Sequence, residues 1–256
     1  MYYNLKNRIL LFLTDIRRSF WVITVYVLIV PFFILLSFAQ AKSAMTIGIP
    51  CMADYIATLN YGYLLDIIIV PMSLMLIINI ISQNDTVNFL IRQKNKQSLI
   101  LNQYVDILIL SIFLSIYCVI IAVFVSGLFS SVTINWNDNA SYFYLSLDYT
   151  MDINFAKVVL LTIIKKFFTF YLFSCVYFTL SLLLKQVFCY FIIIFLLSID
   201  IFRYITFYLI TLLNLPQVEQ RYISIPYMIL LFFIIPIICF LSILLSLRLI
   251  KRKDFL

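Results

Sequence analysis

Long apolar runs alternate with short polar intervals along the whole chain. A helix needs about 20 apolar residues to cross a hydrocarbon core of about 30 Å, so each run is long enough to span a bilayer. The six runs lie at residues 20–39, 61–81, 105–128, 155–184, 187–214 and 226–247. The pattern therefore predicts an all-α, polytopic integral membrane protein, with six transmembrane helices in a single domain over residues 1–256.

The N-terminal segment, residues 1–19, surrounds a short apolar cluster with basic residues. This pattern is typical of a helix that lies flat on an anionic membrane surface, and we expect an interfacial helix here. The alternative is a basic flank that only orients the first span.

Basic residues also predict the orientation of the spans. An even number of crossings puts both termini on one side, and placing that side in the cytoplasm leaves most of the 18 Lys and Arg residues inside. Residues 130–152, the longest polar stretch, then face outward. Their aromatic residues suit the interfacial belt, with an outer gate that touches cargo as the alternative; they are Trp136, Tyr142, Tyr144 and Tyr149.

Composition supports the membrane assignment, since 65% of residues are hydrophobic and only 11% are charged. A soluble domain has about half its residues apolar and about a quarter charged. We therefore expect a multi-pass protein of the plasma membrane. The net charge of +7 follows from the positions of the basic residues, so no nucleic-acid partner is expected.

Residue types that are rare or missing exclude several kinds of chemistry. The chain has no His and only 3 Gly, so it cannot contain the glycine-rich phosphate loop that binds ATP. Missing His also removes the usual general base and a common metal ligand. The 5 Cys are scattered singly, without metal or redox spacing. We expect no catalytic residue, no metal and no cofactor in this chain.

The interval at residues 82–104 has the features of a contact surface. An Asn-Asp pair near its start can cap a helix, and Val87, Leu90 and Ile91 then share one helical face. Basic residues follow at the far end, which suits the helix dipole. We interpret the interval as a cytoplasmic helix that another protein contacts. The alternative is a solvated loop that follows the positive-inside rule.

Charged residues inside the apolar runs are candidates for a cargo path or an intramembrane ion pair. They are Lys165, Lys166, Asp200 and Arg203. The fourth run is longer than a bilayer requires, so its first third should project outward and carry Lys157, Lys165 and Lys166 to the outer headgroups. Snorkelling is the simplest explanation of these lysines. Asp200 and Arg203 are spaced to pair with each other on one helix.

Three segments, read with the six spans and the basic N-terminus, resemble the permease subunits of ABC-2-type transporters. The segments are DTVNFLIRQKNKQSLILNQYVDIL after the second run, LSLLLKQVF after the fourth and RKDF at the end. The similarity covers nearly the whole chain. This chain lacks the glycine usual in the family's inner interval and has Gln103 near the position of its usual lysine.

The resemblance implies a non-catalytic membrane subunit that pairs with a second permease copy or paralogue and with two cytoplasmic ATPase subunits. Those subunits would bind ATP and Mg²⁺ and push on the interval. Family members export antimicrobial or cytolytic peptides, drugs, lipids and polysaccharide precursors, and we expect an amphipathic peptide here. The residues that this implies at the ATPase contact are Asp85, Thr86, Phe89, Leu90, Arg92, Lys94 and Lys96.

Two other functions are compatible with six spans. One is a carrier or channel that works without ATP, although no repeat between the two halves of the chain suggests it. The other is a membrane immunity or interaction protein that transports nothing.

Overall fold

The computed structural model describes residue 17 and residues 19–59, 63–82, 96–148, 150–202 and 230–252. These residues are organised by helices. The long ones are α2 (Phe20–Ala44), α4 (Tyr63–Ser82), α6 (Lys96–Gly127), α8 (Phe155–Ser181), α9 (Gln186–Phe202) and α13 (Ile235–Arg252). The short ones are α3 (Met52–Thr58), α7 (Tyr142–Leu147) and the π-helical turn η2 (Leu230–Ile234) that leads into α13.

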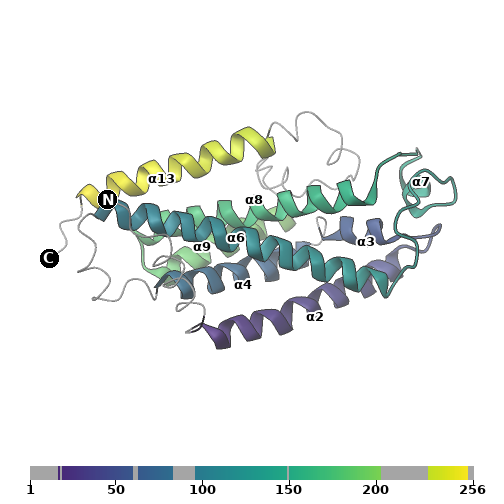
Figure 1. Ribbon diagram of the computed structural model, residues 1–256, viewed down its shortest axis with the longest axis horizontal. Coiled ribbons are helices and arrows are strands. Elements are labelled where there is room, and N and C mark those ends of the chain that lie inside the picture. Colours follow the sequence, from purple (N-terminus) through teal and green to yellow (C-terminus); the bar gives the residue numbers. More distant parts are fainter. Residues whose placement is uncertain are drawn as a thin grey trace.

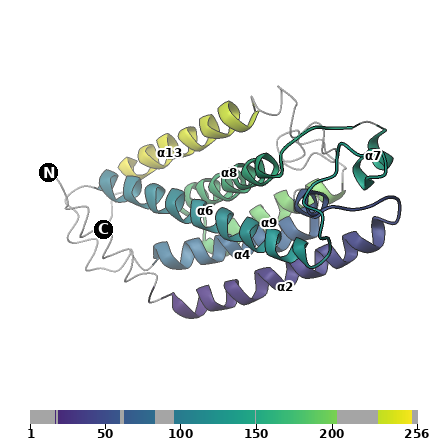
Figure 2. The same cartoon turned by 45° about the vertical axis from the view of Figure 1, so that its right-hand side comes forward.

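The long helices form an elongated bundle in which successive helices reverse direction (Figure 1). Both views place α2 along one flank and α13 along the opposite flank, with α6 and α8 between them (Figures 1 and 2). The short helices α3 and α7 lie together at one end. We call this the outer end and the opposite end the inner end, after the orientation that the basic residues predict.

Among the described residues, four helices are long and apolar enough to cross a membrane, which indicates an all-helical, multi-pass membrane protein. They cover Phe20–Ala44, Gln97–Gly127, Phe155–Ser181 and Phe232–Ile250. Two shorter apolar helices lie in α4 and α9, at Ile68–Ile81 and Gln186–Leu197. Six complete crossings and the side on which the termini lie stay predictions.

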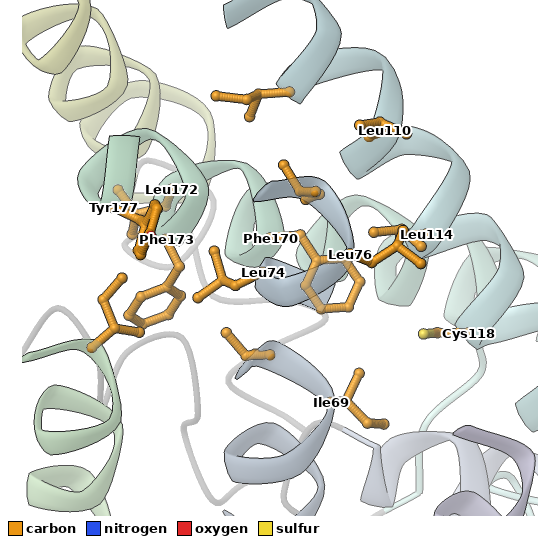
Figure 3. Packing of buried hydrophobic residues seen from close by; sticks show 14 of the residues in the cluster. Ile69, Leu74, Leu76, Leu110, Leu114, Cys118, Phe170, Leu172, Phe173 and Tyr177 are labelled. Atoms are coloured by element: carbon orange, nitrogen blue, oxygen red, sulfur yellow. The ribbon is translucent and has the colours of Figure 1, made fainter. Parts of the chain in front are cut away.

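Helix α8 is the centre of the bundle and contacts α6, α13, α4, α9 and α3. In its apolar window 56% of residues are buried, compared with 22% in α2 and in α13, so the two flanking helices present most of their surface outward. Around α8 the core contains large apolar side chains from several helices, of which Figure 3 labels those of α4, α6 and α8. Phe170 and Phe173 from α8, Leu74 from α4 and Leu114 from α6 belong to one buried cluster.

A folded cap closes the outer end, with a small apolar core of its own. Backbone hydrogen bonds join its two strands of chain at Ile49 and Ser141, where they form an isolated parallel bridge. Its buried residues are Cys51, Ala53, Ile56, Ala57, Trp136, Phe143, Met151, Ile153 and Val158. The two outer intervals of the sequence therefore fold against each other.

One cap residue corrects an expectation from the sequence. Trp136, expected in the interfacial aromatic belt, is fully buried and stacks on Phe143 with ring centroids 4.6 Å apart. The prediction was wrong because the indole has two partners, the nearby Phe143 ring, which covers its apolar face, and the distant Asp54 carboxyl, which accepts from its N–H group.

The third long helix also starts earlier than its apolar run suggested. Hydropathy placed the span at residues 105–128, whereas α6 runs without a break from Lys96 to Gly127. The end of the predicted contact interval, residues 96–104, is thus part of the same helix as the apolar run. Polar residues such as Gln97 and Asn102 lower the local hydropathy without interrupting the helical hydrogen bonds.

Candidate functional site

Most residues predicted at the ATPase contact lie outside the described part of the chain. These are Asp85, Thr86, Phe89, Leu90, Arg92 and Lys94. Lys96 is the first residue of α6, so the predicted interval leads directly into a core helix of the bundle. The described residues next to this junction form the candidate site.

A hydrogen-bonded node centred on Tyr104 joins the inner parts of three helices. The Tyr104 Oη of α6 lies 2.9 Å from Thr179 Oγ1 of α8 and 2.7 Å from Ser246 Oγ of α13. It also donates to the Ser242 carbonyl oxygen at 3.3 Å. Hydrogen bonds between side chains of different helices help membrane helices to associate, so these contacts join α6, α8 and α13 at this level.

The ring of Tyr104 adds a second contact between α6 and α8. It meets Phe178 edge to face, with centroids 5.1 Å apart and an interplanar angle of 85°. Edge-to-face pairs of this kind add about 0.5–1.5 kcal/mol to the burial of the rings. Tyr104 therefore holds α8 through its hydroxyl and through its ring, on two successive residues.

Another tyrosine forms a comparable node elsewhere in the bundle. Tyr26 Oη of α2 lies 2.9 Å from Ser73 Oγ of α4 and 3.4 Å from Cys118 Sγ of α6. Tyr117 of α6 donates to the Val27 carbonyl oxygen of α2 at 2.8 Å. These bonds join α2 to the bundle without touching α8 or α13, which makes them a natural reference for the Tyr104 node.

A partly enclosed cavity of about 40 Å³ lies beside the Tyr104 node. Its walls come from the facing sides of α4 and α8, with single residues from α6 and α9. The lining residues are Leu74, Ile77, Ile78, Ile81, Ile107, Ser174, Tyr177, Phe178, Ser181 and Gln186. Figure 3 shows Leu74 and Tyr177 in this region of the core. The side-chain oxygens of Ser174 and Tyr177 are buried and make no hydrogen bond in the structure.

The lysines of α8 are placed differently from the sequence expectation. Lys157 is exposed near the outer end of the bundle, whereas Lys165 and Lys166 are only 3% and 2% exposed. Snorkelling is therefore wrong for these two, because α8 is the central helix and neighbouring helices cover the positions from which a lysine would reach water. Both lysines have interaction partners.

Buried hydroxyls accompany the two lysines on the same helix. Thr162 and Thr169 are both buried, and their hydroxyls donate to the carbonyl oxygens of Val158 and Lys165. Residues 162, 165, 166 and 169 follow helical spacing, so they form one polar strip along α8. Of the other predicted pair, Asp200 lies in α9, where only its backbone is described, and Arg203 lies outside the described residues.

The cap contains a buried carboxyl that the sequence did not single out. Asp54 Oδ2 accepts from the backbone N–H of Cys51 at 2.8 Å, and Oδ1 accepts from Trp136 Nε1 at 2.7 Å. Burial raises the pKa of Asp54 above its ordinary value, although these two donors lower it in part. Burial, with the nearby Asp54 carboxyl, also raises the pKa of the Cys51 thiol to about 12. Asp54 at the third position of α3 is a capping signal that the sequence did contain.

No arrangement for a resident metal is present among the residues that the structure describes, where no three His, Cys, Asp or Glu side chains gather. Comparison with protein-family models, with curated proteins and with solved structures finds no match.

Proposed function

We propose that this protein is the membrane-spanning permease subunit of an ATP-driven exporter, whose separate ATPase subunits bind at residues 82–104. The Tyr104 node is the observation that carries the proposal. It lies about two helical turns after Lys96, inside the interval on which the ATPases would act, and it bonds to α8 and α13. A displacement of the interval would thus move three helices together.

Rigidity of α6 supports this mechanical role. The helix continues from Lys96 to Gly127, so a tilt imposed at its inner end is not absorbed by a loop before it reaches the bundle. Packed helix interfaces tend to have discrete arrangements, and ATP-driven closure of the partner subunits would favour one of them. The chain itself would provide the path and the moving parts, and the partners would provide the free energy.

An amphipathic peptide drawn from the membrane is the proposed cargo, exported without chemical change. The proposal predicts that deleting the gene sensitises cells to such a peptide. Sensitivity that changes only for sugars or small drugs would contradict the peptide assignment while leaving the pump in place.

Co-purification tests the coupling role directly. The full chain, extracted in mild detergent from its own membranes, should retain an ATPase subunit that contains a phosphate loop. The combined variant Arg92→Glu, Lys94→Glu and Lys96→Glu should lose that subunit. Lys157→Glu is the matched control, since Lys157 is exposed at the outer end. Equal retention of the ATPase by both variants, or no ATPase with the wild type, would sink the proposal.

A carrier that works without ATP is the second candidate, and one observation favours it. Two ionisable side chains, Lys165 and Lys166, are buried in a membrane helix beside buried threonine hydroxyls. Intramembrane charges of this kind commonly mark ion or proton pathways. Uptake or release of an amphipathic peptide by proteoliposomes that contain only this chain, driven by a pH gradient and abolished by Lys165→Met, would favour the carrier over the pump.

A further inference from the structure

We propose that the cavity beside α4, α6, α8 and α9 is a binding pocket for an uncharged amphiphile, an aliphatic or aromatic chain that carries one hydroxyl or carbonyl group. The interpretation of this ligand as part of the exported cargo rests on the proposed function. Binding itself does not, because the pocket is built entirely by this chain.

Two buried hydroxyls indicate a polar group in the ligand. Ser174 is 2% exposed and Tyr177 is 3% exposed, and neither side-chain oxygen has a hydrogen-bond partner. Leaving such a buried group without a hydrogen bond is destabilising, because its desolvation is not compensated. Both residues line the same cavity from one helix, separated by a single turn. A hydroxyl or carbonyl group of a ligand that enters the cavity can form a hydrogen bond with one or both of these side chains. Binding would therefore compensate for the water that the ligand group loses.

The remaining walls indicate the rest of the ligand. Leucine and isoleucine side chains of α4 and the ring of Phe178 cover most of the surface, and the lining contains no charged residue. A charged group would lose its hydration here without a counter-ion, which is strongly unfavourable. The pocket therefore selects against ions and favours an uncharged polar group on an apolar chain.

Size and openness fit a chain end. The volume of about 40 Å³ exceeds the roughly 10–15 Å³ needed to hold one water molecule. The cavity is only partly enclosed, so the polar end and first carbon atoms of a chain can enter while the remainder extends outward. Ser181 and Gln186, at the inner ends of α8 and α9, lie among the lining residues, which places the cavity at the inner part of the bundle.

The pocket shares a wall with the Tyr104 node. Phe178 lines the cavity and packs against the Tyr104 ring, and the adjacent Thr179 forms a hydrogen bond with the Tyr104 hydroxyl. Motion of α6 at its inner end would therefore change the pocket that holds the ligand. This connection supplies the step between the pushed interval and release of cargo.

Photolabelling with a diazirine derivative of octanol tests the pocket, because this probe is an uncharged chain with one hydroxyl. The purified full chain in detergent micelles is labelled and the modified residues are identified by mass spectrometry. We expect saturable labelling on the cavity walls of α4 and α8, removed by excess unlabelled octanol. Ser174→Ala combined with Tyr177→Phe should reduce that labelling at least fivefold.

Matched controls separate the pocket from general effects on folding. Ser111→Ala and Tyr55→Phe make the same substitutions at buried hydroxyls that also lack partners but do not line the cavity. Both should leave the labelling unchanged, and Ser174→Leu, which fills the space, should abolish it. Labelling of the cavity walls that cannot be saturated, or that survives in both pocket variants, would overturn the proposal. Because no ATPase takes part, such a failure is distinct from loss of ATPase binding.

Discussion

Replacing Tyr104 by Phe removes the hydroxyl at the centre of the inner node and keeps the ring against Phe178. The substitution deletes one oxygen atom and adds no volume, so the packing of α6 against α8 should persist. What disappears is the direct bond from α6 to α8 and α13. The proposed mechanism therefore predicts a small loss of stability and a large loss of coupling.

The expected stability loss follows from the bonds that remain. Ser246 keeps a contact to Thr179 at 3.2 Å, and Thr179 keeps a donated bond to the Cys175 carbonyl oxygen at 2.9 Å. Neither partner is left unsatisfied, so the cost is the net value of the lost bonds. Interhelical hydrogen bonds in membranes contribute on average about 0.6 kcal/mol and at most about 1.7 kcal/mol each. Two short bonds give about 1–2 kcal/mol.

Two assays measure the two effects separately. Titration with SDS in mixed micelles gives the free energy of unfolding, and complementation of a deletion strain gives resistance to an amphipathic peptide. Tyr104→Phe should unfold at slightly lower SDS, retain the ATPase on co-purification and fail to restore resistance. Retained binding with lost transport is the signature of a broken link rather than of a missing subunit.

Tyr26→Phe is the matched control, since that hydroxyl also joins helices through two contacts, to Ser73 and Cys118. It should lower stability by a similar amount and leave peptide resistance intact. If Tyr104→Phe restores full resistance, the node does not transmit motion. If Tyr26→Phe loses resistance equally, the effect is one of general stability and the reasoning about Tyr104 is refuted.

Three further predictions concern the outer cap, and its unfolding can be followed by Trp136 fluorescence in a Trp21→Phe background. Because burial raises the folded-state pKa of Asp54, cap stability should be greatest below the ordinary Asp pKa of about 3.9 and should fall as pH rises through the raised value. Asp54→Asn should flatten this pH dependence. A variant whose stability depends on pH as steeply as that of the wild type would contradict the prediction. Trp136→Phe removes one of the two donors to the buried Asp54 carboxyl and should lower the free energy of unfolding by about 1–3 kcal/mol, beyond the effect of the smaller ring. Thermal denaturation measures this loss, because the variant has no Trp136 fluorescence. Gly48→Ala should be still more harmful, since Gly48 has φ +80° and a Cβ there would lie 2.9 Å from the backbone nitrogen of Tyr142; a midpoint equal to that of the wild type would show that the turn can relax.

The helices were predictable from sequence because one short-range property determines them. A run of apolar residues is helical in a bilayer whatever its neighbours are, since the backbone has no other hydrogen-bond partners there. Residue 20 begins both the first predicted run and α2, and residue 155 begins both the fourth run and α8. The start of α6 was missed by nine residues because hydropathy detects the lipid boundary and not the end of the helical hydrogen bonds.

The site was not predictable in the same way because its contacts join distant residues. Tyr104 bonds to Thr179 and Ser246, which lie 75 and 142 residues further along the chain, and Asp54 and Trp136 are separated by 82 residues. Burial of Lys166 depends on α8 being central, and no local pattern indicates which of several apolar helices takes that position. A tyrosine among polar residues at the start of α6 was the signal available for the inner node.

Helix α6 connects the two ends of the molecule, and its length explains how a contact at one end could act at the other. Its 32 residues extend about 48 Å at about 1.5 Å per residue, well beyond a hydrocarbon core of about 30 Å. At the outer end Val123 packs against the cap core, which holds that end in place. Near the inner end Tyr104 holds α8 and α13.

A rigid rod that is fixed at one end and pushed at the other moves most where the push is applied, and the cavity beside Phe178 lies in that part of the bundle. The cap therefore has a role in the proposed mechanism, because a held outer end concentrates the motion of α6 at its inner end, where the cavity lies, whereas without it the same push would spread over the whole length of α6.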